Sequence, residues 1–268
     1  MEFRKQALSK LQAPEELDLP VRFARPQGWL VLAVTVVVMA AGAFWALTGT
    51  VSSTLEADGV LTHAEGSYVL QSPVAGQVTD VLAEAGRNLP TGTPLLKIRT
   101  PHGDSVVRTL AAGRLTTLAV TIGAVVTTGT DVATVERVDH PGDPLLAVLY
   151  VPAARAASVP QGAPVDLTLQ SVPVDRYGVL RGRVQTVGKA AQSRQQVTAF
   201  LGDAELGRAF TRQGSPVPVV VRLDTSQHTK SGYRWSSPQG PPFTVQSMTA
   251  AVARIRLADQ RPADWLLP

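Results

Sequence analysis

The longest hydrophobic stretch of the chain lies near its N-terminus. No Asp, Glu, Lys or Arg occurs over residues 26–55, and within this interval the run Trp29–Leu47 has a single polar residue, Thr35. At about 1.5 Å per residue, a helix of this length spans roughly 30 Å, which matches the hydrocarbon core of a bilayer. The pattern predicts a transmembrane helix over residues 26–50. Four residues near its ends, two of them with indole rings that favour the membrane interface, are expected to anchor it: Trp29, Leu30, Trp45 and Leu47.

Two other structures fit an apolar run of this kind. A buried helix of a soluble domain usually keeps a polar face, and this run has none. A cleaved signal peptide ends in a small-residue motif, which Ala41–Ala43 supplies, but the run is longer than an ordinary signal core and follows an unusually long leader. Both alternatives are weaker than a membrane-spanning helix.

The charges that flank this run predict its orientation. Residues 1–25 contain five basic residues, whereas the twenty-five residues after Leu47 contain no Lys or Arg. The positive-inside rule therefore places the N-terminal tail in the cytoplasm and residues 56–268 outside it. We expect a single-pass protein of the cell membrane whose bulk is extracytoplasmic.

The tail has a helical pattern of its own. Phe3, Ala7, Leu8 and Leu11 recur at helical spacing, and Pro14 ends the pattern. A short amphipathic helix is expected here, which docks on a partner or lies on the membrane. The residues alone favour neither.

Beyond the hydrophobic run, short apolar alternations are separated by glycines, and they form an internal repeat. Residues 72–98 align with residues 109–135 at a constant offset of 37. Val, Leu and Thr alternate between the glycines with the period of a β-strand. We expect two half-motifs that bury their apolar faces against each other as a small sandwich, although two unrelated glycine-rich hairpin regions are the simpler alternative. The turn glycines pair as Gly76 with Gly113, Gly86 with Gly123 and Gly92 with Gly129.

These half-motifs resemble the lipoyl or biotinyl carrier fold. The resemblance rests on Pro73–Val78 and on the shared glycine spacing, and the second half departs from it by having Leu110 in the place of Pro73. In such carriers the modified lysine lies on the hairpin that joins the two halves. Here that connection, residues 100–105, contains no lysine, and Lys97 lies in the last strand of the first half. We therefore expect no covalent lipoate or biotin and no cofactor.

The rest of the chain resembles the periplasmic adaptor proteins of the HlyD type, also called membrane fusion proteins. Strands are expected at 145–152, 217–223 and 252–257, with short helices near 153–158 and 203–212. Gly178 and Gly182 allow a close approach or a bulge in strands that curve to close a barrel. The expected fold is mainly β. Its parts are a cytoplasmic tail (1–25), a transmembrane helix (26–50), a membrane-proximal strand or linker (51–68), a lipoyl-like split-motif domain (69–138), a β-barrel adaptor domain (139–225) and a C-terminal segment that returns to the membrane-proximal or barrel region (226–268).

The resemblance is nearest to the adaptors of peptide-bacteriocin exporters of the nitrile-hydratase-leader-peptide (NHLP) class. It implies an ABC transporter in the same membrane as partner, an exported peptide as substrate and a homo-oligomeric ring. Three segments support it: residues 3–17 of the tail, residues 231–242 around Tyr233 and Trp235, and the ending, residues 260–268. Packing of the C-terminal segment on the barrel is the simpler role for Tyr233 and Trp235.

One departure from the Gram-negative adaptors concerns the connection between the half-motifs. Those adaptors insert a long α-helical hairpin there, and it reaches an outer-membrane channel. This chain has six residues at that place and no helical heptads after residue 56. We expect no long α-helical hairpin and no outer-membrane channel as partner.

Composition removes several other functions. The chain has no cysteine, and its four histidines are scattered, so a thiolate site, a cysteine nucleophile or a histidine metal site lacks support. No block of basic residues interleaves with aromatics, which argues against nucleic-acid binding. Catalytic motifs such as G-x-S-x-G and H-E-x-x-H are missing, although the chain has enough acidic residues to form a catalytic pair of carboxylates. A non-catalytic adaptor is preferred over a membrane-anchored envelope scaffold or binding module, and both over a tethered enzyme.

Overall fold

The structure is a computed structural model, and it describes residues 26–48, 50, 52–138, 140 and 142–258. The chain divides into two compact units, of which the first contains residues 1–51 and 260–268 and the second residues 52–259. The expected tail helix and the final segment, 260–268, lie outside the described residues.

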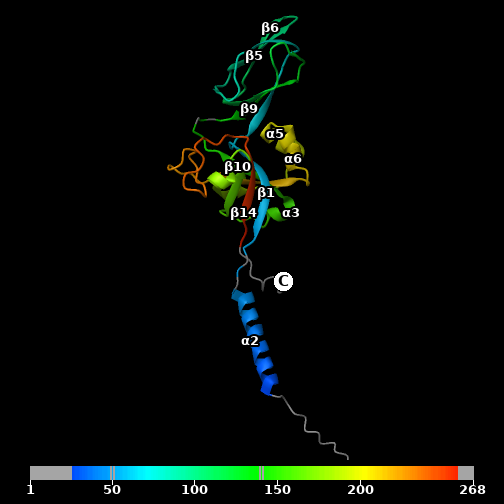
Figure 1. Cartoon of the computed structure of the whole chain (residues 1–268). Helices are drawn as coiled ribbons and strands as arrows, with labels where there is room; N and C mark the ends of the chain where they lie inside the picture. Colours follow the sequence, from blue (N-terminus) through cyan, green and yellow to red (C-terminus); the bar gives the residue numbers. More distant parts are fainter. Residues whose placement is uncertain (1–25, 49, 51, 139, 141, 259–268) are drawn as a thin grey trace, which may run out of the picture. The chain divides into compact units, whose positions relative to one another are not determined.

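The described part of the first unit is helix α2 (Pro26–Thr48). Its residues Gly28–Thr48 are long and apolar enough to cross a membrane, and no part of its most apolar window is buried inside the protein. Figure 1 draws α2 as one uninterrupted helix. Thr35 and Thr48, two polar residues of this helix, donate their hydroxyls to the carbonyl oxygens of Val31 and Phe44, at 2.8 and 2.6 Å. These bonds satisfy the hydroxyls without water.

The second unit contains a sandwich of two four-stranded antiparallel sheets. One sheet has the order β2-β9-β7-β4 and the other the order β6-β5-β3-β8. Each sheet contains strands from both half-motifs, so the halves are intertwined. The bounds are β2 Ser67–Gln71, β3 Gly76–Val81, β4 Asn88–Leu89, β5 Pro94–Thr100, β6 Gly103–Arg108, β7 Gly113–Leu118, β8 Val125–Val126 and β9 Asp131–Arg137.

The sequence offset of 37 holds strand by strand. Strands β3, β4 and β5 coincide with β7, β8 and β9 when 37 is added to their residue numbers. The hydrogen bonds repeat as well, because Gly86 N donates to Leu115 O at 2.6 Å and Gly123 N donates to Val78 O at 2.8 Å. The two half-motifs thus have the same backbone and exchange equivalent bonds. Their buried apolar residues form one core: Leu70, Val78, Ala83, Leu95, Leu96, Ile98, Val107, Leu115, Val126, Val132, Ala133 and Val135.

A closed six-stranded barrel forms the rest of the unit, in the order β1-β10-β13-β12-β11-β14 (Figure 1). Its first and last strands come from the segments that precede and follow the expected barrel range of 139–225. Residues 51–68, expected as a membrane-proximal strand or linker, contain β1, and residues 226–268, expected to return to the membrane-proximal or barrel region, contain β14. The bounds are β1 Thr54–Thr62, β10 Leu146–Pro152, β11 Pro164–Leu169, β12 Leu180–Val187, β13 Pro216–Leu223 and β14 Ala250–Arg256.

Alternating residues of these strands point inward and fill the barrel, including Leu61, Leu149, Leu167, Leu180 and Ile255, which are almost fully buried. Gly182 lies where β12 approaches β13, since a Cβ at this position would be 2.8 Å from a Val221 methyl group. The bulge of β12 falls nearby, between Val184 and Thr186. A bulge increases the twist and bend of a strand, which favours the curvature that β12 needs in a closed barrel.

Two short helices cover part of the outer barrel wall. Helix α5 (Arg194–Leu201) is preceded by a capping box at Ser193. Helix α6 (Ala204–Phe210) is capped by Asp203, whose carboxylate accepts two backbone N–H bonds. Val197 and Leu201 of α5 pack on the outward-facing Val60 and Val148 of the barrel. Two single-turn helices, α3 (Ala153–Ala156) and α4 (Val174–Tyr177), complete the described secondary structure.

The mainly β fold, with an apolar N-terminal helix and a barrel, confirms the fold class expected from the sequence. Helix α5 was not expected.

The equivalence of the half-motifs allows a matched test of the closest backbone contacts. A Cβ on Gly113 would lie 2.2 Å from the Glu136 carbonyl oxygen, and one on Gly76 would lie 2.2 Å from the Arg99 carbonyl oxygen. We expect Gly76→Ala and Gly113→Ala each to lower the free energy of unfolding by about 1–3 kcal/mol, because the strands must move apart. Urea unfolding of the detergent-solubilised full chain, followed by circular dichroism, measures this.

Gly142→Ala is the control, because nothing lies within 4 Å of a Cβ there. Losses in the two sandwich variants no larger than in this control would contradict the close approach.

Candidate functional site

The hairpin that joins the two half-motifs is a tight turn. Thr100 of β5 pairs with Gly103 of β6, so only Pro101 and His102 lie between the strands. The Thr100 hydroxyl donates to the Gly103 carbonyl oxygen at 2.7 Å, which closes the turn. No lysine lies on it, and none occurs between Lys97 and Lys189. The turn lacks the group that a lipoyl or biotinyl carrier modifies.

Lys97 itself is engaged in an ion pair on the outer face of β5. Its Nζ lies 3.0 Å from Oδ2 of Asp104, and Nε of Arg99 lies 3.8 Å from Oδ1 of the same carboxylate. The hydrogen bond from Lys97, with the charges of Lys97 and Arg99, lowers the pKa of Asp104 below its ordinary value of 3.8. Lys97 is therefore a partner of Asp104 and is not extended as a carrier arm.

The residues singled out in the sequence lie in three different environments. The anchor residues Trp29, Leu30, Trp45 and Leu47 are 59–68 % exposed on α2. Of the six repeat glycines, four occupy turns with positive φ, between +78° and +90°: Gly86, Gly92, Gly123 and Gly129. Gly76 and Gly113 begin strands and are required by the close approach described above.

A buried carboxylate joins the sandwich to the barrel. Glu136, near the end of β9, has no exposed surface. Its Oε1 accepts hydrogen bonds from the Thr62 hydroxyl at 3.2 Å and from the His63 backbone N–H at 3.1 Å. Its Oε2 accepts a short hydrogen bond from the Ser247 hydroxyl. Groups from β9, the end of β1 and the segment before β14 thus meet on one side chain.

The side chain of His63 adds a further contact to this carboxylate. Its Nδ1 lies 2.8 Å from Oε1 of Glu136, at the distance of an ion pair but without the alignment of a hydrogen bond. Burial would raise the pKa of Glu136, but the contacts from His63 and Ser247 outweigh it and hold the pKa below its ordinary value of 4.5. The carboxylate is ionised at neutral pH, and it fixes the junction through charge-assisted hydrogen bonds.

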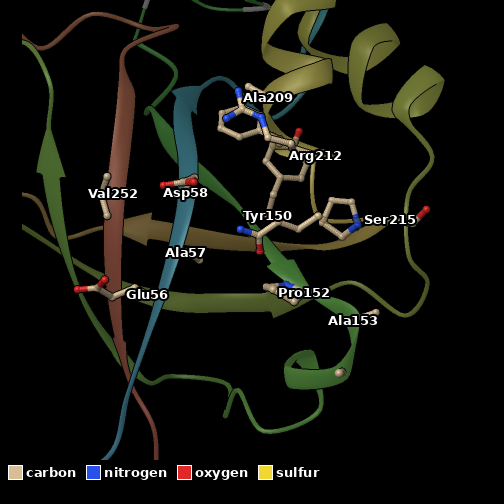
Figure 2. A pocket seen from close by; sticks show the side chains of 15 residues that line it. Glu56, Ala57, Asp58, Tyr150, Pro152, Ala153, Ala209, Arg212, Ser215 and Val252 are labelled. Atoms are coloured by element: carbon tan, nitrogen blue, oxygen red, sulfur yellow. The ribbon is translucent and has the colours of Figure 1, made fainter.

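An open groove of about 600 Å³ lies on the outer wall of the barrel (Figure 2). Figure 2 shows Glu56 and Asp58 on β1 and Val252 on β14, with Arg212 and Ser215 on the segment that follows α6. Tyr150 of β10 also lines the groove, and its ring stacks on that of Phe210, with the ring centres 4.7 Å apart and 22° between the planes. Burial raises the pKa of the Tyr150 hydroxyl, which therefore stays protonated.

Metal chemistry finds no support in the described part of the chain, where no group of three or more His, Cys, Asp or Glu side chains could hold a metal ion.

The barrel receives the sandwich as an insertion between two neighbouring strands, β1 and β10. No protein-family model matches the chain. Among solved structures it is similar to ZneB from Cupriavidus metallidurans, with 11 % identity, a TM-score of 0.50 and coverage of 78 % of this chain and 100 % of that one.

A chimera of MacA with the α-hairpin domain of Pseudomonas aeruginosa MexA is similar to the same extent, with 10 % identity, a TM-score of 0.50 and coverage of 80 % and 84 %. The membrane fusion protein Spr0693 from Streptococcus pneumoniae has 10 % identity, a TM-score of 0.40 and coverage of 76 % and 99 %. At these identities the likeness concerns the fold.

Glu136 was not identified from the sequence. At the repeat offset of 37 it aligns with Arg99, whose side chain is 70 % exposed. Strand alternation therefore assigns it to an outer face, and only docking against the barrel buries it. Tyr150 was missed for a similar reason, because Phe210, whose ring stacks on it, is distant in sequence.

The junction carboxylate predicts a pH-dependent stability. Because the folded-state pKa of Glu136 lies below 4.5, its ionised form stabilises the fold above about that pH, and this contribution is lost as the pH falls through the folded-state pKa. We expect Glu136→Gln to lower the free energy of unfolding at pH 7 by about 1–3 kcal/mol, with a smaller loss at pH 4. Urea unfolding at both pH values measures the difference.

Glu84→Gln is the matched control, since the side chain of Glu84 is 83 % exposed and lies 4.0 Å from Arg87. A Glu136→Gln variant as stable as this control at pH 7 would show that the junction does not depend on the charge.

Proposed function

We propose that this chain is a non-catalytic adaptor subunit of an ABC-transporter-driven peptide export system, and that it forms an oligomeric collar on the extracytoplasmic side of the membrane. The observation that supports this best is a carrier-like sandwich without a carrier lysine, inserted into a barrel, on a chain with a membrane-crossing helix. A sandwich of this type without its prosthetic group has lost the carrier chemistry and keeps the scaffold. Several copies of such a scaffold can assemble into a collar around the path of an exported peptide.

The proposed orientation follows from the charges around α2. Five basic residues precede the helix and the twenty-five residues after Leu47 have none, which favours a cytoplasmic N-terminus. Residues 1–25 then face the cytoplasmic side of the transporter. The sandwich and the barrel then lie on the extracytoplasmic side, where the transporter releases its substrate.

The turn between β5 and β6 supports an exporter without an outer-membrane channel. The chimera that shares this fold contains an α-hairpin domain. In this chain Pro101 and His102 alone lie between the two strands. A two-residue turn cannot extend across a second compartment, so we propose export across a single membrane.

The two half-motifs supply an internal comparison that favours self-assembly through the second half. Val125 and Ile122 are 78 % and 66 % exposed, whereas the equivalent residues of the first half are Asn88 and Ala85. Because the backbones are equivalent, the fold does not require large apolar residues at these positions. We propose that Ile122 and Val125 contact the neighbouring copy in a ring, in which identical side-to-side contacts close on themselves.

Affinity purification tests the partner. We expect the full-length protein in mild detergent to co-purify an ABC transporter, and we expect deletion of residues 1–25 to abolish the recovery, because the tail makes the cytoplasmic contact. Mass spectrometry and immunodetection measure the transporter. Unchanged recovery without the tail would overturn tail docking, and no transporter with either protein would favour an envelope scaffold.

Single-particle imaging of the full-length protein in detergent tests the collar, and we expect closed rings. The double variant Ile122→Ala, Val125→Asn, which gives the second half the residues of the first, is expected to disperse the rings without lowering the melting temperature. Monomers of the unmodified protein would contradict the collar. Intact rings in the variant would exclude these two residues as the contact.

A further inference from the structure

The long loop between β13 and β14, drawn in orange in Figure 1, forms one side of an open pocket, and α4 forms the other. The pocket has a volume of about 660 Å³, which lies in the usual range for a ligand site, about 300–1,000 Å³. Its lining includes Arg176 and Tyr177 from α4, with His228, Lys230 and Pro242 from the loop. Two permanent cations therefore meet on one concave surface.

These cations lack a counter-charge. No Asp or Glu lines the pocket, and neither Arg176 nor Lys230 forms an ion pair with any residue that the structure describes. Asp175 is adjacent to Arg176 along the chain but lies outside the lining. Counting its carboxylate would still leave one positive charge in excess.

Other arginines close to this part of the barrel do have acidic partners. Arg181 forms an ion pair with Asp166. Arg183 and Arg234 share Asp224, with nitrogen to oxygen distances of 3.8 and 4.0 Å. These carboxylates are already paired, so the fold supplies counter-charges to the neighbouring arginines and leaves the cations of the pocket for a ligand.

Hydrogen bonds between the loop and the end of α4 hold the two sides of the pocket together. The Ser237 hydroxyl donates to the Tyr177 carbonyl oxygen at 2.5 Å, and the Gly240 N–H donates to the Ser237 oxygen at 3.3 Å. The Val179 N–H donates to the Ser236 hydroxyl oxygen at 2.9 Å. The pocket is thus formed without a ligand, and a preformed site spends less free energy on ordering when it binds.

Two aromatic residues of the loop pack inward and support this surface. Trp235 is 5 % exposed, and its indole N–H donates to the Ser231 hydroxyl oxygen at 2.9 Å. Gly240 lies against the indole, since a Cβ at this position would be 2.6 Å from Cδ1 of Trp235. The Tyr233 hydroxyl accepts a hydrogen bond from the Leu145 N–H at 3.1 Å. Both aromatics position the loop, and its exposed residues are left to line the pocket.

The cations are arranged for carboxylate groups. The guanidinium carbon of Arg176 lies 5.3 Å from the centre of the Tyr177 ring, a cation–π contact that positions the guanidinium and leaves its N–H donors free. A guanidinium binds a carboxylate through two parallel hydrogen bonds, and the ammonium of Lys230 supplies a second charge. Tyr177 and Pro242 add apolar surface beside them. Acidic side chains of a peptide match both parts of this surface.

An anionic membrane is the other class of partner for exposed cations. Basic sites that bind anionic lipids gather about four to eight lysines or arginines. This pocket has two, and they lie in a concavity beside an aromatic ring. A peptide is therefore favoured over a membrane surface.

We propose that this pocket binds an acidic segment of the exported peptide while the peptide passes the adaptor. Arg176 binds one carboxylate, Lys230 binds a second, and Tyr177 and Pro242 contact the apolar part of the segment. The exported peptide as the source rests on the proposed function. It is favoured because exposed cations in an open pocket bind weakly and reversibly, which suits a transient contact better than a permanent subunit interface.

The absence of cysteine from the chain makes a direct binding test possible. Gln239→Cys places a single thiol at the pocket of the full-length protein, and Ser215→Cys places one at an exposed position outside its lining. The probe is the peptide acetyl-Gly-Glu-Glu-Gly-amide in an uncharged detergent. The comparison peptide has glutamine in place of both glutamates, so it is neutral with nearly the same shape.

We expect the glutamate peptide to slow alkylation of the thiol introduced by Gln239→Cys with iodoacetamide, by about twofold at half occupancy of the pocket. The thiol introduced by Ser215→Cys reacts at an unchanged rate, and the glutamine peptide protects neither thiol. Equal protection by both peptides, or no protection by the glutamate peptide, would overturn the proposal.

A matched pair of double variants separates the pocket from the net charge of the chain. Adding Arg176→Gln and Lys230→Gln to the pocket thiol is expected to abolish the protection. Adding Arg155→Gln and Lys189→Gln removes the same charge at two exposed positions outside the lining and leaves the protection intact. Protection that survives loss of the pocket cations, or that is lost equally in both double variants, would contradict a site at this pocket.

Reconstitution tests the membrane as the partner. We expect the thiol introduced by Gln239→Cys to be alkylated at the same rate in phosphatidylcholine and in phosphatidylglycerol vesicles. Slower alkylation in phosphatidylglycerol, restored by Arg176→Gln with Lys230→Gln, would assign the pocket to anionic lipid and overturn the proposal.

Cross-linking from the thiol introduced by Gln239→Cys, in cells that export the peptide, tests the source of the acidic segment. Capture of the exported peptide, lost with Arg176→Gln and Lys230→Gln, supports the assignment. Capture of the transporter or of a second copy of this chain, or export without any captured peptide, overturns it. If the transporter co-purifies but the glutamate peptide gives no protection, the pocket assignment is wrong while the adaptor function stands; if the glutamate peptide protects but no transporter is recovered, the adaptor function is wrong while recognition of acidic side chains stands.

Discussion

The pairing of β1 with β14 is the contact on which the second unit depends. The two strands pair over seven residues, from Thr54 with Arg256 to Val60 with Ala250, and β1 also pairs with β10 on its other side. This places β1 between strands that lie about ninety and two hundred residues away in the sequence. The barrel closes only because both of these distant strands pair with β1. The positions of the outward-facing side chains of β1, including those that line the groove, depend on that closure.

The sandwich occupies the connection between two neighbouring barrel strands. The chain leaves the barrel at Thr62, forms eight sandwich strands and returns at Leu146. The carboxylate of Glu136 binds Thr62 and His63, the residues at the exit point, and also the hydroxyl of Ser247 just before β14. A single ionised group therefore ties the insertion to the two strands that close the barrel. Its cost of burial is offset by donors from two segments, the end of β1 and the segment before β14, which explains why its pKa is low although it is buried.

The parts of the fold that were predictable from the sequence are those with local or repeated signals. The uncharged run defines α2, and the glycine pairs at a constant offset define the two half-motifs. The assignment of residues 51–68 as a strand or linker could not be refined, because the residues of β1 do not indicate which strands pair with it. Helix α5 was missed because its eight residues present only Val197 and Leu201 as a buried face, too few for a helical periodicity. Glu136 has an ordinary outward position in its strand, and distant segments of the chain decide that it is buried.

The strand order also has a consequence for the synthesis of the protein. All strands of the sandwich lie between residues 67 and 137, so this part can fold as soon as that stretch has left the ribosome or crossed the membrane. The barrel cannot, because β1 waits for β14 until residue 256 has emerged. During that interval β1 and β11 present unpaired edges to other chains, and unpaired edges are sites of aggregation. Newly made chains are therefore most in need of protection late in their synthesis, after the sandwich has folded and before the barrel has closed.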